Sequence, residues 1–137
     1  MEFALVMPIL LLIVFGIIVY GMVFAQSLSL SNSARQAARS GVIEGTTCGQ
    51  INTLAKDSAD TLGMQGTDAT VTVTRGSSEA GALAFGCTGV STLQPCKTQA
   101  QGTNVYVKLT FAFKPIVPFI PAPSTLTGKG VYRCEFQ

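Results

Sequence analysis

The sequence of 137 residues contains no histidine and no tryptophan, and only 12% of its residues are charged. Without histidine, the usual general base beside a serine or cysteine nucleophile and the commonest metal ligand are both missing. The sequence also has no phosphate-binding glycine loop, no paired carboxylates at a useful spacing and no G-x-S-x-G segment. We therefore predict that the protein is not an enzyme and that it uses no cofactor and no metal.

The low charge excludes further classes of protein. The net charge is +2 and 47% of the residues are hydrophobic, which fits neither a nucleic-acid binder nor a disordered tail. Four acidic residues, Asp57, Asp60, Asp68 and Glu79, follow no known calcium-loop pattern, so we expect them to be solvated.

What the sequence does contain is a long apolar run at its start. No charged residue occurs from Phe3 to Ala25, and a helix of that length measures roughly 33 Å, enough to cross a hydrocarbon core of about 30 Å. A signal peptide is the alternative, with AQSLS around Ala25 as a weak cleavage site. A signal peptide would carry a basic region before a shorter run, however, and the first basic residue is Arg35. We predict a retained transmembrane helix over residues 1–25.

The same helix is expected to continue beyond the membrane. Residues 26–40 contain neither glycine nor proline, so we predict an exported continuation over residues 26–45 that stops at Gly45. Pro8 removes a backbone donor inside the apolar half and predicts a kink or a loosened turn. Small residues recur at helical spacing in the outer half, which predicts packing on the protein's own sheet, with another subunit as the alternative: Ala34, Ala37, Ala38 and Gly41.

Residues 46–137 are expected to form one small extracytoplasmic domain. Thr46 or Thr47 can cap a second helix from Cys48 to about Leu62, ended by Gly63. Its buried stripe follows the period of 3.6 residues: Ile51, Leu54, Ala55, Ala59 and Leu62.

Strand patterns follow this helix. Residues 70–74 and 104–113 alternate apolar and polar side chains, and a third strand is predicted over roughly residues 125–136, carrying Cys134. The side chains predicted on the core face of the central strand are Val105, Val107, Leu109, Phe111 and Phe113. Residues 76–102, rich in Gly, Ser and Thr, predict a long loop. The fold class is therefore α+β, with the long helix and a short second helix packed on a small antiparallel sheet of about three strands.

A proline-rich connector, PIVPFIPAP, covers residues 115–123. Its four prolines exclude a helix and disfavour an inner strand. We predict a lid over the core of the sheet. The alternative is an exposed patch that touches the membrane or a partner.

Four cysteines remain to be explained. Their spacings of 39, 9 and 38 positions include no C-x-x-C pair, which disfavours zinc and favours two disulfides in an exported domain. Three pairings are possible. We predict Cys87 with Cys96, closing a short loop around Pro95, and Cys48 with Cys134.

The basic residues after the apolar run argue for a cytoplasmic location of that side, but we give the cysteines more weight and predict an extracytoplasmic domain.

The first 45 residues resemble the opening of TadE-like minor pilins and pseudopilins of the Tad (Flp, tight-adherence) type IV pilus system. Glu2 and Phe3 are followed by ALVMPILLLIVFGIIVYG, close to the family pattern E-F-A-L-V-x-P-x-L-L-L-L, and residues 32–41, NSARQAARSG, are similar to its N-A-A-R-x-A-A-R-x-G segment. The segments at 113–118 and 126–135 also resemble the closing part of such proteins.

The resemblance implies a pilin-like fold and a structural subunit that acts in the biogenesis or priming of a Tad/Flp pilus. It implies that Glu2, Phe3 and Pro8 act in assembly, with Glu2 pairing with a neighbour's N-terminal amine. A solvated helix terminus is the alternative explanation of Glu2. The implied partners are a TadF-like minor pilin, the Flp major pilin and the Tad inner-membrane platform with its ATPase.

One feature departs from the family pattern. Family precursors carry a basic leader and a glycine cleavage site before the glutamate, whereas Met1 stands directly before Glu2. We expect the native precursor to start earlier and to meet a prepilin peptidase; a member that is not processed is the alternative. A membrane-anchored or secreted extracytoplasmic binding or adhesion protein unrelated to pili remains the competing function.

Overall fold

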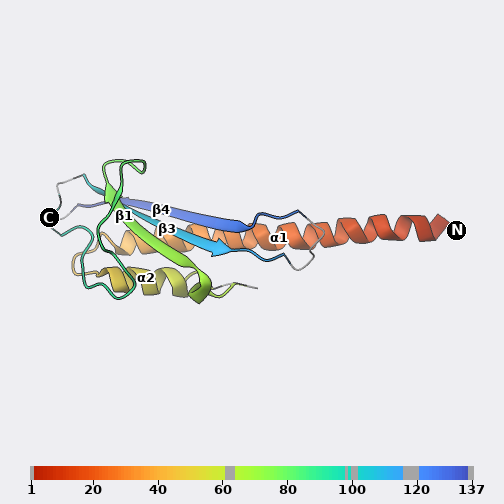
Figure 1. The fold of residues 1–137 in the computed structure, drawn as a ribbon, viewed down its shortest axis with the longest axis horizontal. Coiled ribbons are helices and arrows are strands. Elements are labelled where there is room, and N and C mark those ends of the chain that lie inside the picture. The colour runs from red at the N-terminus through yellow and green to blue at the C-terminus, as the bar shows by residue number, and fades with distance from the viewer. Residues whose placement is uncertain (1, 61–63, 98, 100–101, 116–120, 136–137) are drawn as a thin grey trace.

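The structure is a computed structural model that describes residues 2–60, 64–97, 99, 102–115 and 121–135. A single long helix, α1 (Glu2–Ser40), runs the length of the molecule. The rest of the chain packs on the C-terminal half of this helix, while the N-terminal half projects away alone (Figure 1). The fold is therefore α+β with the predicted pilin-like arrangement.

Helix α1 is continuous over 39 residues and runs past Ala25, as the absence of breakers after residue 25 predicted; Pro8 lies inside it. It ends at Ser40, five residues before the predicted stop. Successive turn hydrogen bonds follow, from Val42 N to the Arg39 carbonyl and from Ile43 N to the Ser40 carbonyl. Gly45 lies in these turns at a φ of +85°, a conformation that favours glycine.

Helix α2 (Cys48–Asp57) starts where it was predicted. Thr47 caps it in a capping box: the Gln50 amide N–H donates to the Thr47 hydroxyl, and the Thr47 N–H donates to Gln50 Oε1 at 2.9 Å. The helix ends at Asp57, earlier than predicted, and Leu62 and Gly63 lie outside the described residues. Of its predicted stripe, Ile51, Ala55 and the following Ala59 are fully buried, as expected, whereas Leu54 is only half-buried.

The sheet is antiparallel throughout and has the order β2-β1-β3-β4. Its strands are β1 (Thr70–Gly76), β2 (Leu83–Ala84), β3 (Asn104–Ala112) and β4 (Thr125–Arg133). The three predicted strands are confirmed. The sequence did not predict the two-residue β2, which lies inside the predicted loop and pairs with the end of β1. Cys134 was predicted to lie within β4 but lies just after it.

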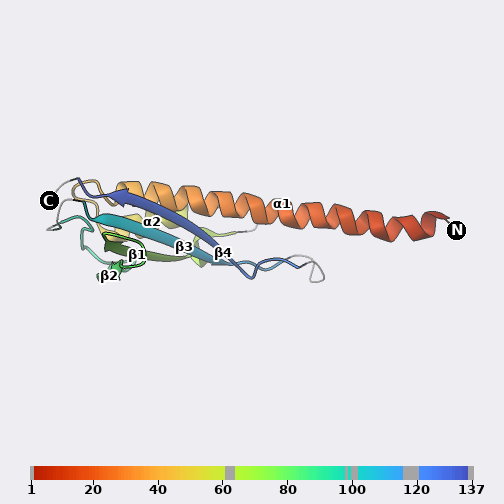
Figure 2. The same cartoon turned by 90° about the horizontal axis from the view of Figure 1, so that it is seen from above.

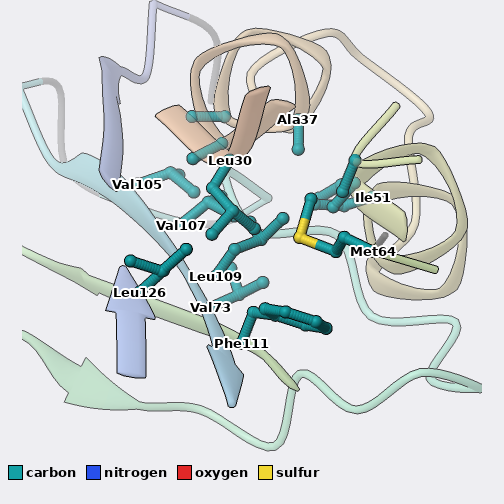
Figure 3. Close-up of a cluster of buried hydrophobic side chains, with 14 of the residues drawn as sticks. Leu30, Ala37, Ile51, Met64, Val73, Val105, Val107, Leu109, Phe111 and Leu126 are labelled. Atoms are coloured by element: carbon teal, nitrogen blue, oxygen red, sulfur yellow. The ribbon is translucent and has the colours of Figure 1, made fainter. Parts of the chain in front are cut away.

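One hydrophobic core lies between the sheet, α1 and α2. The alternation predicted for β3 is confirmed, because Val105, Val107, Leu109, Phe111 and Phe113 are all buried. In Figure 3 the side chain of Leu30 from α1 meets Val107 and Leu109 from β3, with Ile51 and Met64 closing the core from the side of α2.

The contact between α1 and β4 is unusually close because β4 presents glycine to the helix. Gly128 and Gly130 are buried, and a Cβ added to either would overlap the α1 backbone at Leu30 and Ala34 respectively. The small-residue face of α1 is buried: Ala34, Ala37, Ala38 and Gly41. Ala34 lies against Gly130 of β4, as predicted for packing on the protein's own sheet, whereas Gly41 faces Ile51 of α2.

The disulfides join Cys48 to Cys87 and Cys96 to Cys134, so the predicted pairing is wrong. The segment 87–96 does not close on itself because it docks on the start of α2. The Cys48 N–H donates to the Leu93 carbonyl at 2.8 Å, which holds this segment at the helix start, and the Cα atoms of Cys48 and Cys87 lie 5.3 Å apart.

Arg75 gives the loop after β1 a second attachment. Its guanidinium lies 4.3 Å from the ring centre of Phe85 and donates a hydrogen bond to the Pro95 carbonyl at 3.3 Å. The loop therefore runs between fixed points on α2, β1 and Cys134.

We predict that Gly128→Ala destabilises the protein by about 2 kcal/mol, because the added methyl group overpacks the contact with α1. The thermal midpoint of the full chain in detergent micelles, followed by near-UV circular dichroism, should fall by about 8–16 °C. Gly21→Ala is the matched control, since an added Cβ there meets nothing within 4 Å. Equal midpoints for the two variants would show that β4 does not lie directly on the helix.

We also predict that the native protein, digested without reductant by trypsin and thermolysin, yields peptides linking Cys48 to Cys87 and Cys96 to Cys134. Thermolysin is needed because trypsin alone leaves Cys87 and Cys96 on one peptide. A linkage between Cys87 and Cys96, read by mass spectrometry, would contradict the docking of this segment on α2.

Candidate functional site

Residues 6–18 of α1 form an apolar surface over which the described part of the chain lays no covering layer. Its large apolar side chains are exposed around the whole helix: Val6, Met7, Ile9, Leu10, Leu11, Leu12, Ile13, Val14, Phe15, Ile17 and Ile18. By length and composition, α1 is the one helix among the described residues that could cross a membrane. A continuous apolar surface of this kind marks contact with lipid or with other apolar helices.

The predicted assembly residues lie at the far end of this surface. The backbone of Glu2 and Phe3 forms the first turn of α1, and Pro8 follows within the helix. All three lie in the projecting half, away from the folded domain (Figure 1).

The folded domain first touches α1 at Val19, which lies inside the predicted transmembrane helix over residues 1–25. Val19 is only 2% exposed, and Val23 packs against the core. The Tyr20 hydroxyl donates a hydrogen bond of 2.9 Å to the carbonyl of Pro121. A tyrosine inside an apolar run was the available signal, because a phenol in such surroundings needs a hydrogen-bond partner.

Polar side chains enter the buried face of α1 beyond this point. Gln26 and Ser33 are both buried, and the Ser33 hydroxyl donates to the Ser29 carbonyl at 2.8 Å. Ser29 in turn donates to the Ala59 carbonyl at 3.4 Å, which ties α1 to the chain after α2. The helix therefore changes from an apolar rod to a core element between residues 19 and 33.

The described residues present no group of three His, Cys, Asp or Glu side chains that could hold a metal ion. Two of the acidic residues have structural contacts instead of solvation alone. Asp60 accepts a hydrogen bond from the Gly66 N–H, and Glu79 pairs with Lys129 at 2.5 Å. The Glu79–Lys129 pair is well exposed on both sides, so it adds little stability.

The proline-rich connector is described only at its ends. Residues 116–120 lie outside the described residues, so the predicted lid stays a prediction there. At the ends, the Phe113 N–H donates to the Ser124 carbonyl at 2.9 Å, and Ala122 packs against the core. An open groove of about 450 Å³ lies where these ends approach α1, lined in part by Met22, Phe113 and Lys114.

These features define a class of protein: a disulfide-bonded α+β domain carried on a long, half-exposed apolar helix, with a pilin-like arrangement. Such a helix is typical of a membrane anchor or a signal sequence, and the disulfides are typical of an extracytoplasmic domain. The family model described as TadE-like protein matches residues 1–39, so this segment is similar to TadE-like proteins, in line with the resemblance seen in the sequence. No curated protein and no solved structure matches the chain.

The family match coincides with α1 almost residue for residue, since the helix ends at Ser40. The similarity to TadE-like proteins that the match shows is thus a similarity of the helix. The sheet and α2 lie outside the match.

The contacts of Val19, Tyr20 and Val23 predict that these residues remain in the mature protein. The intact mass of the native protein, purified from membranes without reductant, should include Glu2 onward. Alkylation should add mass at all four cysteines only after reduction. A mature mass that begins after Ala25 would contradict this, because cleavage there removes the contacts of residues 19–23 with the domain.

Proposed function

We propose that the protein is a TadE-like minor pilin or pseudopilin, a structural subunit for the biogenesis or priming of a Tad/Flp pilus. The observation that carries the proposal is the exposed apolar half of α1, which lies within the segment matched by the family model. An anchor that has no covering layer over residues 6–18 can exchange one apolar environment for another.

The proposed cycle uses this property of the helix. Residues 1–25 lie first in the cytoplasmic membrane and then enter a bundle in which neighbouring helices replace lipid. Lipid tails are as apolar as leucine, so this exchange gains little hydrophobic energy. Close packing and polar contacts must therefore select the partner helices. Side chains exposed on every face of the helix allow several neighbours at once.

Glu2 provides the polar contact in this proposal. A carboxylate at the margin of the hydrocarbon is costly unless it is paired, and the folded domain of its own chain lies at the opposite end of α1 (Figure 1). A neighbouring subunit's N-terminal amine can supply the opposite charge once the helices are bundled. This contact would form only in the assembly and would favour it over the free membrane state.

The proposed location is single-pass in the cytoplasmic membrane, with residues 46–137 extracytoplasmic and the subunit then incorporated in the pilus. The two disulfides support this side of the membrane. The proposed partners are a TadF-like minor pilin, the Flp major pilin, the inner-membrane platform and, for a precursor with a leader, a prepilin peptidase.

We predict that Glu2→Gln and Glu2→Ala leave membrane insertion intact but reduce the number of surface pili by at least about tenfold, because losing a desolvated ion pair costs several kcal/mol. Insertion is measured by resistance to alkaline extraction, and piliation by electron microscopy and by Flp pilin in sheared fractions. Glu44→Gln is the matched control, since Glu44 is exposed in the turns after α1.

Unaltered piliation in both Glu2 variants would refute the assembly role of this carboxylate. Loss of pili in the Glu44→Gln control as well would show that the assay reports general charge loss rather than the helix terminus.

A further inference from the structure

The two ends of the connection between β3 and β4 extend past the sheet along α1, toward its N-terminus (Figures 1 and 2). The hydrogen bond from Phe113 to Ser124 holds the two ends together beyond the last strand pair. The Tyr20 hydroxyl then fixes Pro121 beside the helix. The domain therefore reaches into the stretch of α1 that is predicted to lie in the membrane.

The depth of this reach follows from helix geometry. Tyr20 lies five residues before Ala25, the end of the apolar run, and therefore roughly 8 Å below it along the helix axis. If the apolar run spans the bilayer up to Ala25, Pro121 lies at or below the outer boundary of the hydrocarbon core. These ends then reach the level of the outer lipid interface.

The chemistry of these ends suits that level. We define the interfacial rim as five exposed residues at the junction of α1 and the connector: Tyr20, Phe24, Lys114, Pro121 and Pro123. Aromatic rings are typical of the membrane interface, and a lysine there can keep its apolar stem in the lipid and its ammonium among phosphates.

Part of the backbone of these ends needs no hydrogen bond from water. Irregular chain is costly near hydrocarbon because its N–H groups lack partners. Pro115, Pro121 and Pro123 have no N–H to satisfy, and the N–H of Phe113 is bonded within the protein. The carbonyl of Pro121 is bonded as well, to Tyr20.

We propose that the interfacial rim inserts into the outer interfacial layer of the lipid bilayer and contacts the lipid headgroups, as a second membrane contact beside α1. This inference rests on the proposed function, because it requires α1 to be embedded as a membrane anchor. The rim fixes the depth and the tilt of α1 before the subunit is assembled, since helix tilt is set by anchors of this kind.

The absence of tryptophan from the chain makes a direct test possible. Single tryptophans are introduced into the full-length chain as Pro123→Trp and Lys114→Trp on the two ends of the rim. Val90→Trp is the control, because Val90 is 92% exposed in the loop beyond β2. Leu12→Trp reports on the middle of the anchor. Each variant is reconstituted in phosphatidylcholine vesicles that contain lipid brominated either near the headgroup or deep in the chain.

We expect headgroup-level bromolipid to quench Pro123→Trp and Lys114→Trp at least about twofold more than Val90→Trp, because tryptophan at the interface lies beside that bromine. Deep bromolipid should quench Leu12→Trp most. Resistance of all four cysteines to alkylation without reductant shows that each variant has formed both disulfides. Two rim variants are used so that the test still stands if one of them does not fold.

The proposal is overturned if both folded rim variants are quenched no more than Val90→Trp while Leu12→Trp is quenched by deep bromolipid. That result would show that α1 is embedded in the membrane but that the rim does not contact lipid. It is also overturned if the rim tryptophans are shielded from water only at high protein density and bromolipid quenches them at no density, which would make a second copy the occupant. Absence of quenching at Leu12→Trp would refute membrane anchoring itself, and with it the proposed function.

Discussion

The rest of the structure depends on the contact between the backbone of β4 and the backbone of α1. Gly128 and Gly130 face the helix, and no side chain of β4 fits between them and Leu30 or Ala34. Because the strand lies this close, the small residues of the helix can be fully buried without leaving a cavity. β3 is paired with β4 and therefore brings Val107 and Leu109 over Leu30, where α2 closes the core (Figure 3).

This contact divides α1 into two halves with different surroundings. Residues 30–38 contribute the centre of the domain's core, while the side chains of residues 6–18 are exposed in the described structure. One rigid element thus connects a folded domain to an apolar rod, and a displacement of the rod must move the domain with it. That coupling is what the proposed role requires, because a subunit drawn from lipid into a bundle carries its domain along. The match to the TadE-like family model covers this same helix.

Much of this arrangement was predictable because it follows from local patterns. The apolar run, the alternation from Val105 to Phe113 and the Thr47 cap each depend on neighbouring residues. The disulfide pairing was not predictable, because it depends on where the segment 87–96 docks. That segment is held by backbone hydrogen bonds that the Cys48 and Gly49 N–H groups donate to its carbonyls. The contact of Tyr20 with Pro121 spans 101 positions, and no local pattern encodes it. The Glu2 role remains a prediction from the sequence.

The central claim is that residues 30–38 of α1 and the β3–β4 pair form one cooperative unit. Hydrogen exchange of the full chain in detergent micelles tests it most directly. A helical extension of this length without packing is marginal in water, so its amides would exchange quickly on their own. We predict that the amides of residues 30–38 and those of β3 and β4 share one high free energy of opening. Rapid exchange in residues 30–38 beside a protected sheet would contradict the account.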